Sequence, residues 1–386
     1  MTVRSQVSDG AALKALAIET ALAAGAGAVA VSRARTDEVS RERMAAAFER
    51  GDLATWGYGE EYARKAADPR AVLAGARSVI SIAVPYATAA PVPDGALRGR
   101  VSNYAWSADY HGRLRAMLTA VADALDAAAG APVAKIVCDT APLAERAFAA
   151  RAGLGWVGKH TNLISPELGS FVFLGEIVTT LDLPEDAPLK KTCGSCALCV
   201  TACPTGALRG DYTLDATRCI SDLTQRTDGI PREMRALVGT WIWGCDICQV
   251  VCPPTERARP AVAAANAPRS SESAQPDLLA LLRLKSGAFE RTYRGTAMGW
   301  RGAAVLRRNA AVALGNALDR SAVTALTDAL RNDPHPMVRG HVAWALGKIG
   351  SPAAFEALQR RVRGEQNMKV REEITAALQL FQGARR

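Results

Sequence analysis

Cysteines are the residues of this chain best placed to do chemistry. Eight of the nine lie between residues 190 and 254, in a first block spaced C-x2-C-x2-C-x3-C-P, a single thiol, and a second block spaced C-x2-C-x3-C-P. They are Cys193, Cys196, Cys199, Cys203, Cys219, Cys245, Cys248 and Cys252. This spacing is typical of bacterial proteins that hold two four-iron four-sulfur clusters through cysteine thiolates. The sequence therefore predicts a protein that transfers electrons one at a time.

The order of the cysteines along the chain predicts which of them bind each cluster. In such proteins the fourth cysteine of a block binds the cluster of the other block, so the two ligand sets interlock. One set is then Cys193, Cys196, Cys199 and Cys252, and the other is Cys203, Cys219, Cys245 and Cys248. A zinc site usually takes four ligands from two C-x2-C pairs, and a disulfide framework is typical of short secreted chains. Both alternatives fit the triple run in the first block less well.

Composition limits the class of protein. A chain of 386 residues, 49% hydrophobic and with a mean hydropathy of +0.02, is long enough for two or three globular domains. No uncharged apolar run reaches the roughly 18 residues of a membrane-spanning helix. Lys14 and Glu19 interrupt the apolar part of the N-terminal stretch, so neither a secretory nor a twin-arginine signal is expected. We therefore expect a cytoplasmic protein without membrane contact.

The net charge of +9 comes entirely from the C-terminal quarter. Residues 291–386 contain 16 lysines and arginines against 7 aspartates and glutamates, while the first 290 residues contain 31 of each kind. A basic excess confined to one segment favours a polyanionic partner such as nucleic acid. The alternative interpretation is a solvated helical surface rich in arginine.

The elements before the cysteine blocks predict a mixed α/β domain. Short β-branched runs alternate with segments whose apolar residues recur at helical spacing. Helices are expected at 11–24, 109–129 and 143–151, and strands at 28–32, 77–84, 133–138 and 171–180. The glycine-rich segment 153–164 either approaches a planar ligand or forms a plain hairpin, with Lys159 and His160 exposed.

Asp139 directly follows an expected strand and precedes a helix. Ligands of alternating strand–helix folds lie beyond the carboxyl ends of strands, which favours a role in binding or chemistry. A helix cap or turn is the alternative, and the sequence leaves both open. Asp109-x-His111 begins like the D-x-H-x-x-G string of proteins that bind cobalamin through histidine, but Leu114 replaces the glycine. Cys138 lies outside both cluster motifs and is expected to be a small buried residue.

The last hundred residues repeat with a period of 32. Arg307, Arg339 and Arg371 occupy equivalent positions, and paired helices at this period suggest a short HEAT-like solenoid. These arginines either contact nucleic acid or stabilise neighbouring helices. The Ala-, Pro- and Ser-rich stretch 258–275 before the repeats reads as a linker or irregular wrap.

Taken together, these motifs resemble the epoxyqueuosine reductases, cobalamin-dependent enzymes that complete queuosine formation in tRNA. The resemblance covers essentially the whole chain. It is carried by residues 243–249 (WGCDICQ), 219–221 (CIS), 139–143 (DTAPL), 77–82, 109–111, 155–159 and 169–171, together with the cysteine array. Residues 222–228 (DLTQRTD) depart from the family's usual run.

The resemblance implies a multidomain α+β and α/β protein. Its parts would be a domain at 1–183 that binds base-off cobalamin and a ferredoxin-like two-cluster module at 184–256. A linker at 257–290 and HEAT-like α-helical repeats at 291–386 that bind tRNA would follow. Asp139 would be the catalytic proton donor. The residues implied near cofactor or substrate are Arg64, Tyr104, Asp139, Arg146, Leu163, Leu174, Ser221 and Asp228.

The implied reaction converts an epoxide to an alkene, which takes two electrons and two protons. The clusters would feed electrons from a low-potential donor to cobalamin, and Asp139 would need a pKa raised by burial beside the corrin to hold a proton near neutrality. The implied substrate is the anticodon stem-loop of a tRNA that carries epoxyqueuosine, and a monomer is expected. The alternatives are a soluble reductive dehalogenase acting on a small organohalide and a non-catalytic iron–sulfur electron carrier.

Overall fold

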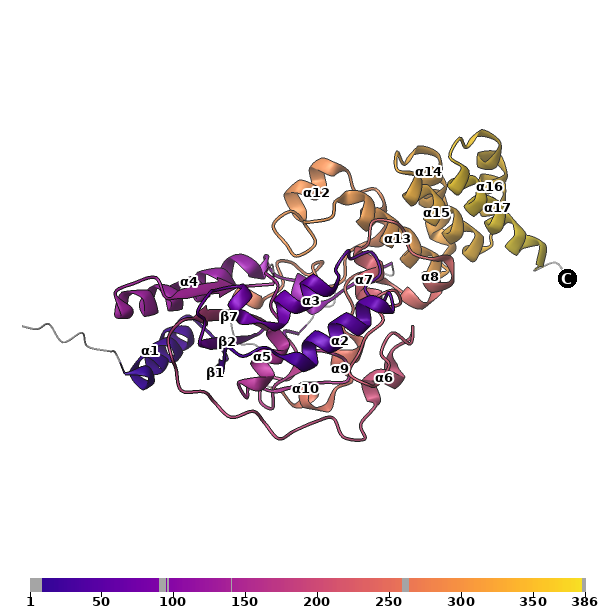
Figure 1. Cartoon of the computed structure of the whole chain (residues 1–386). Helices are drawn as coiled ribbons and strands as arrows, with labels where there is room; N and C mark the ends of the chain where they lie inside the picture. Colours follow the sequence, from indigo (N-terminus) through magenta and orange to yellow (C-terminus); the bar gives the residue numbers. More distant parts are fainter. Residues whose placement is uncertain (1–8, 90–94, 96, 140, 259–263, 384–386) are drawn as a thin grey trace, which may run out of the picture. The chain divides into compact units, whose positions relative to one another are not determined.

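The computed structural model describes residues 9–89, 95, 97–139, 141–258 and 264–383. It divides into two compact units, each assembled from separate stretches of chain (Figure 1). The first unit contains Met1–Thr88, Asp109–Asp215 and Ile247–Asn266, and the second contains Ala89–Ala108, Ala216–Asp246 and Ala267–Arg386. The cysteine-rich region therefore contributes to both units. Thr140 of the DTAPL motif, residues 1–8 of the N-terminal stretch and residues 259–263 of the expected linker lie outside the described residues.

A four-stranded sheet forms the centre of the first unit. Its order is β1 (Ala28–Arg33), β2 (Ser78–Pro85), β7 (Val172–Thr179) and β4 (Ala134–Val137), and every neighbouring pair is antiparallel. The four strands expected from the β-branched runs are therefore confirmed. The strand-end rule applied to Asp139 assumes parallel strands, so this sheet gives it no support.

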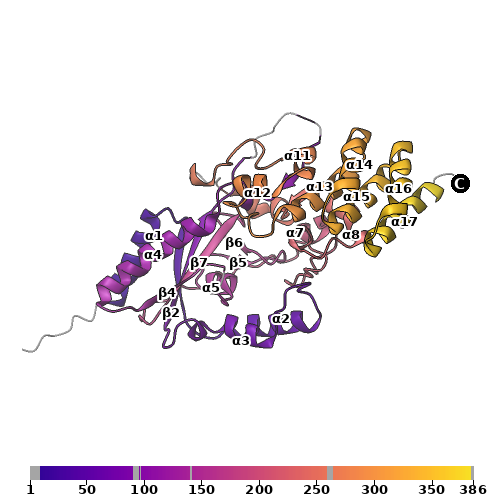
Figure 2. The ribbon, with the colours of Figure 1, turned by 90° about the horizontal axis from the view of Figure 1, so that it is seen from above.

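Helices cover both faces of this sheet (Figure 2). α1 (Gly10–Ala23) and α4 (Tyr110–Ala129) pack together, and a side chain at Gly175 of β7 would collide with Leu118 of α4. On the opposite face, Phe148 of α5 (Glu145–Arg151) packs in one apolar cluster with strand residues. All three expected helices are confirmed, and their apolar spacing marks the sides that face the sheet.

The remaining elements of the first unit are short. They are α2 (Glu38–Glu49), α3 (Glu60–Ala67), η1 (Pro69–Ala71), β5 (Trp156–Val157), β6 (Leu163–Ile164), α6 (Leu198–Ala202), α9 (Ile247–Val250), α10 (Pro253–Arg257) and η3 (Ala264–Asn266). β5 and β6 form a hairpin, one of the two structures predicted for the glycine-rich segment 153–164. The expected exposure of His160 is wrong, because its ring folds back against Gly158 and is only 3% exposed. Burial lowers the pKa of His160 to about 4.

The second unit consists mainly of helices. They are η2 (Asn103–Ala105), α7 (Ile220–Gln225), α8 (Arg232–Val238), α11 (Leu278–Leu282), α12 (Ser286–Thr292), α13 (Ala303–Ala317), η4 (Arg320–Ala322), α14 (Val323–Asn332), α15 (Pro336–Ile349), α16 (Pro352–Gly364) and α17 (Met368–Gly383). A parallel pair, β3 (Arg100–Val101) and β8 (Trp241–Trp243), packs near α13. The paired helices α13–α17 confirm the expected solenoid. Among the described residues, no helix is long and apolar enough to cross a membrane.

Two of the three repeat arginines stabilise the solenoid. Arg307 of α13 forms an ion pair with Asp333, with 2.6 Å between Nε and Oδ2. Arg339 of α15 forms a bidentate pair with Glu365, which is 4% exposed. The structural interpretation is therefore confirmed for these two. Arg371 of α17 is exposed and forms no ion pair within the described part of the chain.

Candidate active site and cluster-binding region

The first predicted set of thiols lies within the first unit. Cys199 is on α6, and Cys252 precedes α10, roughly fifty residues later. Burial, with contributions from Cys193 and Cys196, raises the pKa of Cys199 and of Cys252. Each of these two thiols therefore lies in the electrostatic field of the first block, which suits an interlocking ligand set.

A turn between β6 and β7 of the first unit anchors the Cys252 segment. The Ser170 N–H and hydroxyl lie 3.1 and 2.9 Å from the Thr255 hydroxyl. Gly169 has a φ of +69°, and a side chain there would clash with the Thr255 backbone at 2.8 Å. Glycine is thus required both by the left-handed backbone and by this close approach.

The second predicted set is divided between the units. Cys203 and Cys248 belong to the first unit, and Cys219 and Cys245 to the second. Burial opposes ionisation of Cys203, but hydrogen bonds from Thr205 and from nearby backbone N–H groups outweigh it and lower the pKa of the thiol. N–H groups directed at a sulfur stabilise a thiolate ligand. Among the described residues, no three His, Cys, Asp or Glu side chains are arranged to hold a single metal ion.

Thr224 ties the Cys219 and Cys245 segments together within the second unit. Cys219 caps the start of α7, and the Thr224 hydroxyl near the end of that helix accepts the Gly244 N–H at 3.0 Å. A side chain at Gly244 would collide with Ser102 and approach Tyr104 to 3.0 Å. Tyr104 therefore packs beside the residue that precedes Cys245.

Asp139 has an unusual backbone and a compact set of polar partners. Its φ is +58°, in the left-handed region that aspartate tolerates better than most residues. Its carboxylate lies 3.2 Å from Nε2 of His111 and 3.4 Å from the Tyr110 hydroxyl. His111 Nδ1 lies 2.6 Å from the Asp109 carboxylate. Ala144, not Asp139, occupies the N-cap of α5, so the helix-cap interpretation is wrong.

The contacts at this site favour a proton on His111 over one on Asp139. The hydrogen bond from His111 lowers the pKa of Asp139, and the same bond raises the pKa of His111. Burial alone would raise the pKa of Asp139, but the hydrogen bond from His111 outweighs it; the further rise expected from burial beside the corrin stays a prediction. Each imidazole nitrogen faces a carboxylate, which favours the doubly protonated ring.

Three further predicted residues lie around α5 in the first unit. Arg146 donates to the Thr161 carbonyl at 3.3 Å, and its charge acts on Asp139. Leu163 and the half-buried Leu174 pack in one apolar cluster that includes alanines of α5. A corrin has an apolar ring and polar edges, so the half-buried Leu174 and the charged Arg146 are of the residue types that suit it, whereas Leu163 is only 2% exposed.

The other predicted contacts are not part of this group. Arg64 projects from α3 and pairs with Glu61, with 2.8 Å between Nη2 and Oε1. Ser221 belongs to α7 and, like Tyr104 and Asp228, to the second unit. The structure therefore brings Arg146 near Asp139, places Leu163 and Leu174 in one apolar cluster, and leaves Arg64 in a surface ion pair.

Comparison with known proteins identifies the family. A model described as epoxyqueuosine reductase QueG matches residues 67–140, a 4Fe-4S double cluster binding domain matches 192–255, and HEAT repeats match 302–379. The epoxyqueuosine reductase of Listeria monocytogenes is 37% identical over 378 residues, which cover 97% of this chain and 99% of the relative. This chain belongs to the epoxyqueuosine reductase family.

Solved structures of epoxyqueuosine reductases share the fold. One, with a tRNA-Tyr epoxyqueuosine-modified stem loop, is 34% identical with a TM-score of 0.91, and the match covers 97% of this chain and 100% of the other. The Bacillus subtilis enzyme, with an aspartate catalytic loop swung out of the active site, is 33% identical with a TM-score of 0.90. That match covers 96% of this chain and 100% of the other. The expected multidomain fold is confirmed, including the double-cluster domain and the HEAT repeats.

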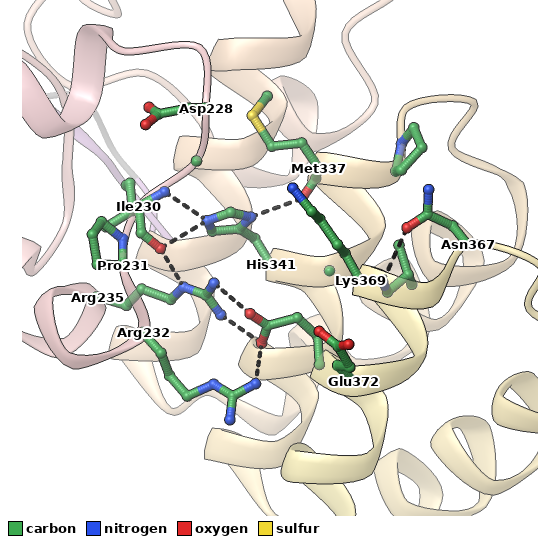
Figure 3. A pocket seen from close by; sticks show the side chains of 15 residues that line it. Asp228, Ile230, Pro231, Arg232, Arg235, Met337, His341, Asn367, Lys369 and Glu372 are labelled. Carbon is green, nitrogen blue, oxygen red and sulfur yellow. Dashed lines mark hydrogen bonds and ion pairs between the residues drawn. The ribbon is translucent and has the colours of Figure 1, made fainter. Parts of the chain in front are cut away.

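A cavity of about 510 Å³ lies in the second unit of this family member (Figure 3). Asp228 and Lys369 line it, and His341 crosses it between Met337 and Ile230. The His341 ring lies 2.7 Å from the Met337 carbonyl and accepts the Ile230 N–H at 3.0 Å. Burial keeps the pKa of His341 well below its usual value. The imidazole therefore links α15 to the loop before α8 as a neutral group.

Sequence reasoning missed a pair of carboxyl groups beside Asp139. Glu145 begins α5, and Glu176 lies in the middle of β7. Glu176 is the only charged residue of the strand sequence VFLGEIVT, which was the signal available before the structure. A charged residue within an apolar, doubly covered strand is rarely structural.

Proposed function

We propose that this protein reduces epoxyqueuosine to queuosine in tRNA, with electrons that pass through two four-iron four-sulfur clusters to cobalamin held base-off by the first unit. The observation that carries the proposal is the His111–Asp139 pair at the end of β4, which gives a member of this reductase family a proton source. The implied cofactor contacts include Arg146, whose charge acts on Asp139, and Leu163 and Leu174, which pack with alanines of α5 in the same unit.

The overall reaction consumes two electrons and two protons, converts the epoxide to an alkene and releases the oxygen as water. Bound cobalamin supplies the low-potential chemistry that no side chain can provide. The protein supplies the acid: His111 holds the proton, and Asp139 passes it to the departing oxygen. Asp109 fixes the other imidazole nitrogen, so the ring keeps its orientation through the transfer.

The left-handed backbone of Asp139 suits a loop that can be repositioned. The Bacillus subtilis relative has been seen with an aspartate catalytic loop swung out of the active site. We infer that the loop containing Asp139 is its counterpart, since Asp139 leaves β4 with a φ of +58°. Backbone conformations of this kind are often found where a segment has two functional positions.

The proposed electron path uses both interlocking thiolate sets. Cys193, Cys196, Cys199 and Cys252 would hold one cluster, and Cys203, Cys219, Cys245 and Cys248 the other. Support comes from the influence of the Cys193 and Cys196 thiols on both Cys199 and Cys252 and from the N–H groups around Cys203. A low-potential protein donor would reduce the clusters in turn.

The proposed substrate is the anticodon stem-loop of a tRNA that carries epoxyqueuosine. A related reductase has been solved with such a stem loop, and the excess of positive charge in residues 291–386 suits a phosphate backbone. Single-stranded loops present splayed bases that a protein can take into a pocket. We propose that the enzyme acts as a cytoplasmic monomer, with Tyr104, Ser221 and Asp228 of the second unit near cofactor or substrate.

Anaerobic turnover tests the proposal. Reconstituted protein, cobalamin, a low-potential reductant and epoxyqueuosine-containing tRNA are combined, and the nucleosides are analysed by mass spectrometry. We expect queuosine, and we expect Asp139→Asn to reduce the rate by about 10²–10⁴-fold. Asp123→Asn, at an exposed position of α4, is the matched control and should leave the rate unchanged.

Two outcomes would overturn parts of this proposal. Bound, reducible corrinoid with unaltered tRNA would refute the substrate and favour reductive chemistry on a small molecule. Protein that retains clusters but no corrinoid would refute the reductase mechanism and favour an electron carrier. Full turnover by Asp139→Asn would remove Asp139 as the proton donor.

A further inference from the structure

Glu176 is buried in the core of the first unit without a cationic partner. Its side chain is fully buried, and among the described residues the groups that act on its carboxyl group are the Ser81 hydroxyl and the Glu145 carboxyl, not a cation. Its cross-strand neighbours on the same sheet face are Ser81 of β2 and Val137 of β4. An ionised carboxylate in such a place is costly, so Glu176 holds a proton unless a base lies next to it.

The neighbouring base is the carboxyl group of Glu145. The two carboxyl groups interact directly, and neither can donate to the other while both are ionised. One shared proton turns one of them into a donor and satisfies the other. Two adjacent carboxyl groups cannot both ionise in a buried site, and their protons are lost in two separate steps.

Burial, reinforced by the neighbouring carboxyl groups, raises both pKa values. The pKa of Glu145 rises to about 7, and that of Glu176 rises well above its usual value. The charged or titratable groups that face Glu145 come from four elements. They are Tyr62 of α3, Cys138 and Asp139 at the end of β4, Arg146 of α5 and Glu176 of β7.

Glu145 also holds the backbone of the proposed catalytic loop. Its Oε1 accepts the Asp139 N–H at 2.9 Å, where the chain adopts the left-handed conformation. This bond turns the Asp139 side chain toward His111. An ionised carboxylate is a considerably stronger acceptor than a neutral carboxyl group, so the charge of Glu145 controls how firmly the loop is held.

We propose that Glu145 and Glu176 share a single proton and act as a positioning pair that keeps the Asp139 loop in its catalytic position only while Glu145 is ionised. The inference rests on the proposed function, because it assigns the pair a role in that reaction. In a plot of turnover against pH, the fall on the acid side (the acid limb) then reflects uptake of a second proton by the Glu145–Glu176 pair. The fall on the alkaline side reflects loss of the proton from His111. A second proton on the pair weakens the bond to the Asp139 N–H and releases the loop.

Three substitutions separate this role from ordinary packing. Glu176→Gln removes the competing acid, so Glu145 ionises more easily and the acid limb moves to lower pH by about one unit or more. Glu145→Gln keeps a neutral acceptor that does not titrate, so turnover should stay at the low level of the acid side at every pH and the acid limb should disappear. Glu145→Ala removes the acceptor and lowers turnover by on the order of tenfold at every pH. Glu167→Gln, exposed in the same unit, is the control.

Infrared spectroscopy of the protein without turnover gives a second measurement. Above neutral pH, wild type should show the carbonyl band of a buried protonated carboxyl group, and Glu176→Gln should lose it because Glu145 is then ionised. Glu145→Gln should keep the band, which then belongs to Glu176. Thermal melting identifies any variant that fails to fold, and the two glutamine variants provide independent tests.

The two proposals fail in different ways. If wild type does not reduce the tRNA, the proposed function fails, while the infrared band still tests the shared proton. If the tRNA is reduced but Glu176→Gln leaves both the acid limb and the band unchanged, the positioning pair is refuted. A fall in turnover with an unaltered pH profile would mean that Glu176 only fills space.

Discussion

Buried charged side chains have complete sets of partners in the helical repeats and lack them beside Asp139. In the repeats, Arg339 forms two hydrogen bonds with Glu365, and Arg361 adds a third interaction at 2.6 Å. In the first unit, Glu176 has only another carboxyl group and a serine beside it. In the repeats, each buried charge is therefore stabilised by an oppositely charged partner, whereas the buried acid of the first unit has no such stabilising contact among the described residues.

The difference separates structural from functional residues. A buried ion pair with all its hydrogen bonds made fixes the register of two helices, and loss of one partner leaves an uncompensated charge. A buried acid without a cation lowers stability whenever it ionises, so the fold gains nothing from it. Substitutions in the repeats should thus change the free energy of unfolding, whereas substitutions near Asp139 should change the pH dependence of the reaction.

The largest expected effect is the loss of a partnered charge. Glu365→Ala leaves Arg339 and Arg361 without their carboxylate, and we expect the free energy of unfolding to fall by about 3–5 kcal/mol. Urea denaturation measures the change. Glu372→Ala, exposed on the next helix, should stay within about 0.5 kcal/mol of wild type. Equal losses in the two variants would contradict the comparison.

The two regions should also respond to pH with opposite signs. The bond to Arg339 lowers the pKa of Glu365 to about 2, so its contribution is present above the unfolded value and disappears as pH falls from about 4.5 toward 2. Glu145, with a pKa raised to about 7, stabilises the fold below its unfolded value and loses that contribution as pH rises through 7. Each pKa shift corresponds to a change of about 3 kcal/mol in the free energy of unfolding.

Unfolding measured against pH in two variants tests these signs. Glu365→Gln should flatten the acid side of the stability curve and leave the neutral side as it is in wild type. Glu176→Gln should flatten the neutral side, because Glu145 then ionises at lower pH. If one variant changes both sides, the two regions are coupled and the comparison fails.

Much of the architecture could be predicted because it is recorded in local patterns. β-branched runs marked the strands of the first unit, and the 32-residue period marked the repeats. The same period contains the ion pairs, since Asp333 and Glu365 each follow their arginine by 26 residues. The thiol spacing was specific enough to indicate the double-cluster domain that the comparisons support.

The electrostatics of the site could not be predicted in the same way. Burial beside the corrin was expected to raise the pKa of Asp139, whereas the hydrogen bond from His111, 28 residues earlier at the start of α4, lowers it. Glu145 and Glu176 meet only because α5 folds back over β7, a contact between elements that no local pattern contains. His160 is buried because its hairpin turns inward. Periodicity shows which face of an element is apolar, whereas a pKa depends on what the tertiary fold places there.

The smallest expected effect concerns the third repeat arginine. Arg371 is equivalent by period to Arg307 and Arg339, yet it is exposed and forms no ion pair among the described residues. We expect Arg371→Glu to leave the free energy of unfolding within about 0.5 kcal/mol. Affinity for the tRNA stem-loop should fall about 3- to 10-fold at low salt, and the slope of log affinity against log salt should decrease by about one.

Arg339→Glu is not an equivalent test of tRNA binding, because it places two carboxylates at a buried pair and removes the fold along with any contact. Arg331→Glu, exposed on α14, is the matched control, since it changes the net charge by the same amount at another position. A loss confined to Arg371→Glu would mean that α17 contacts phosphate. Equal losses would assign the effect to the summed charge of the repeats, and no loss at any salt concentration would remove α17 from the tRNA surface.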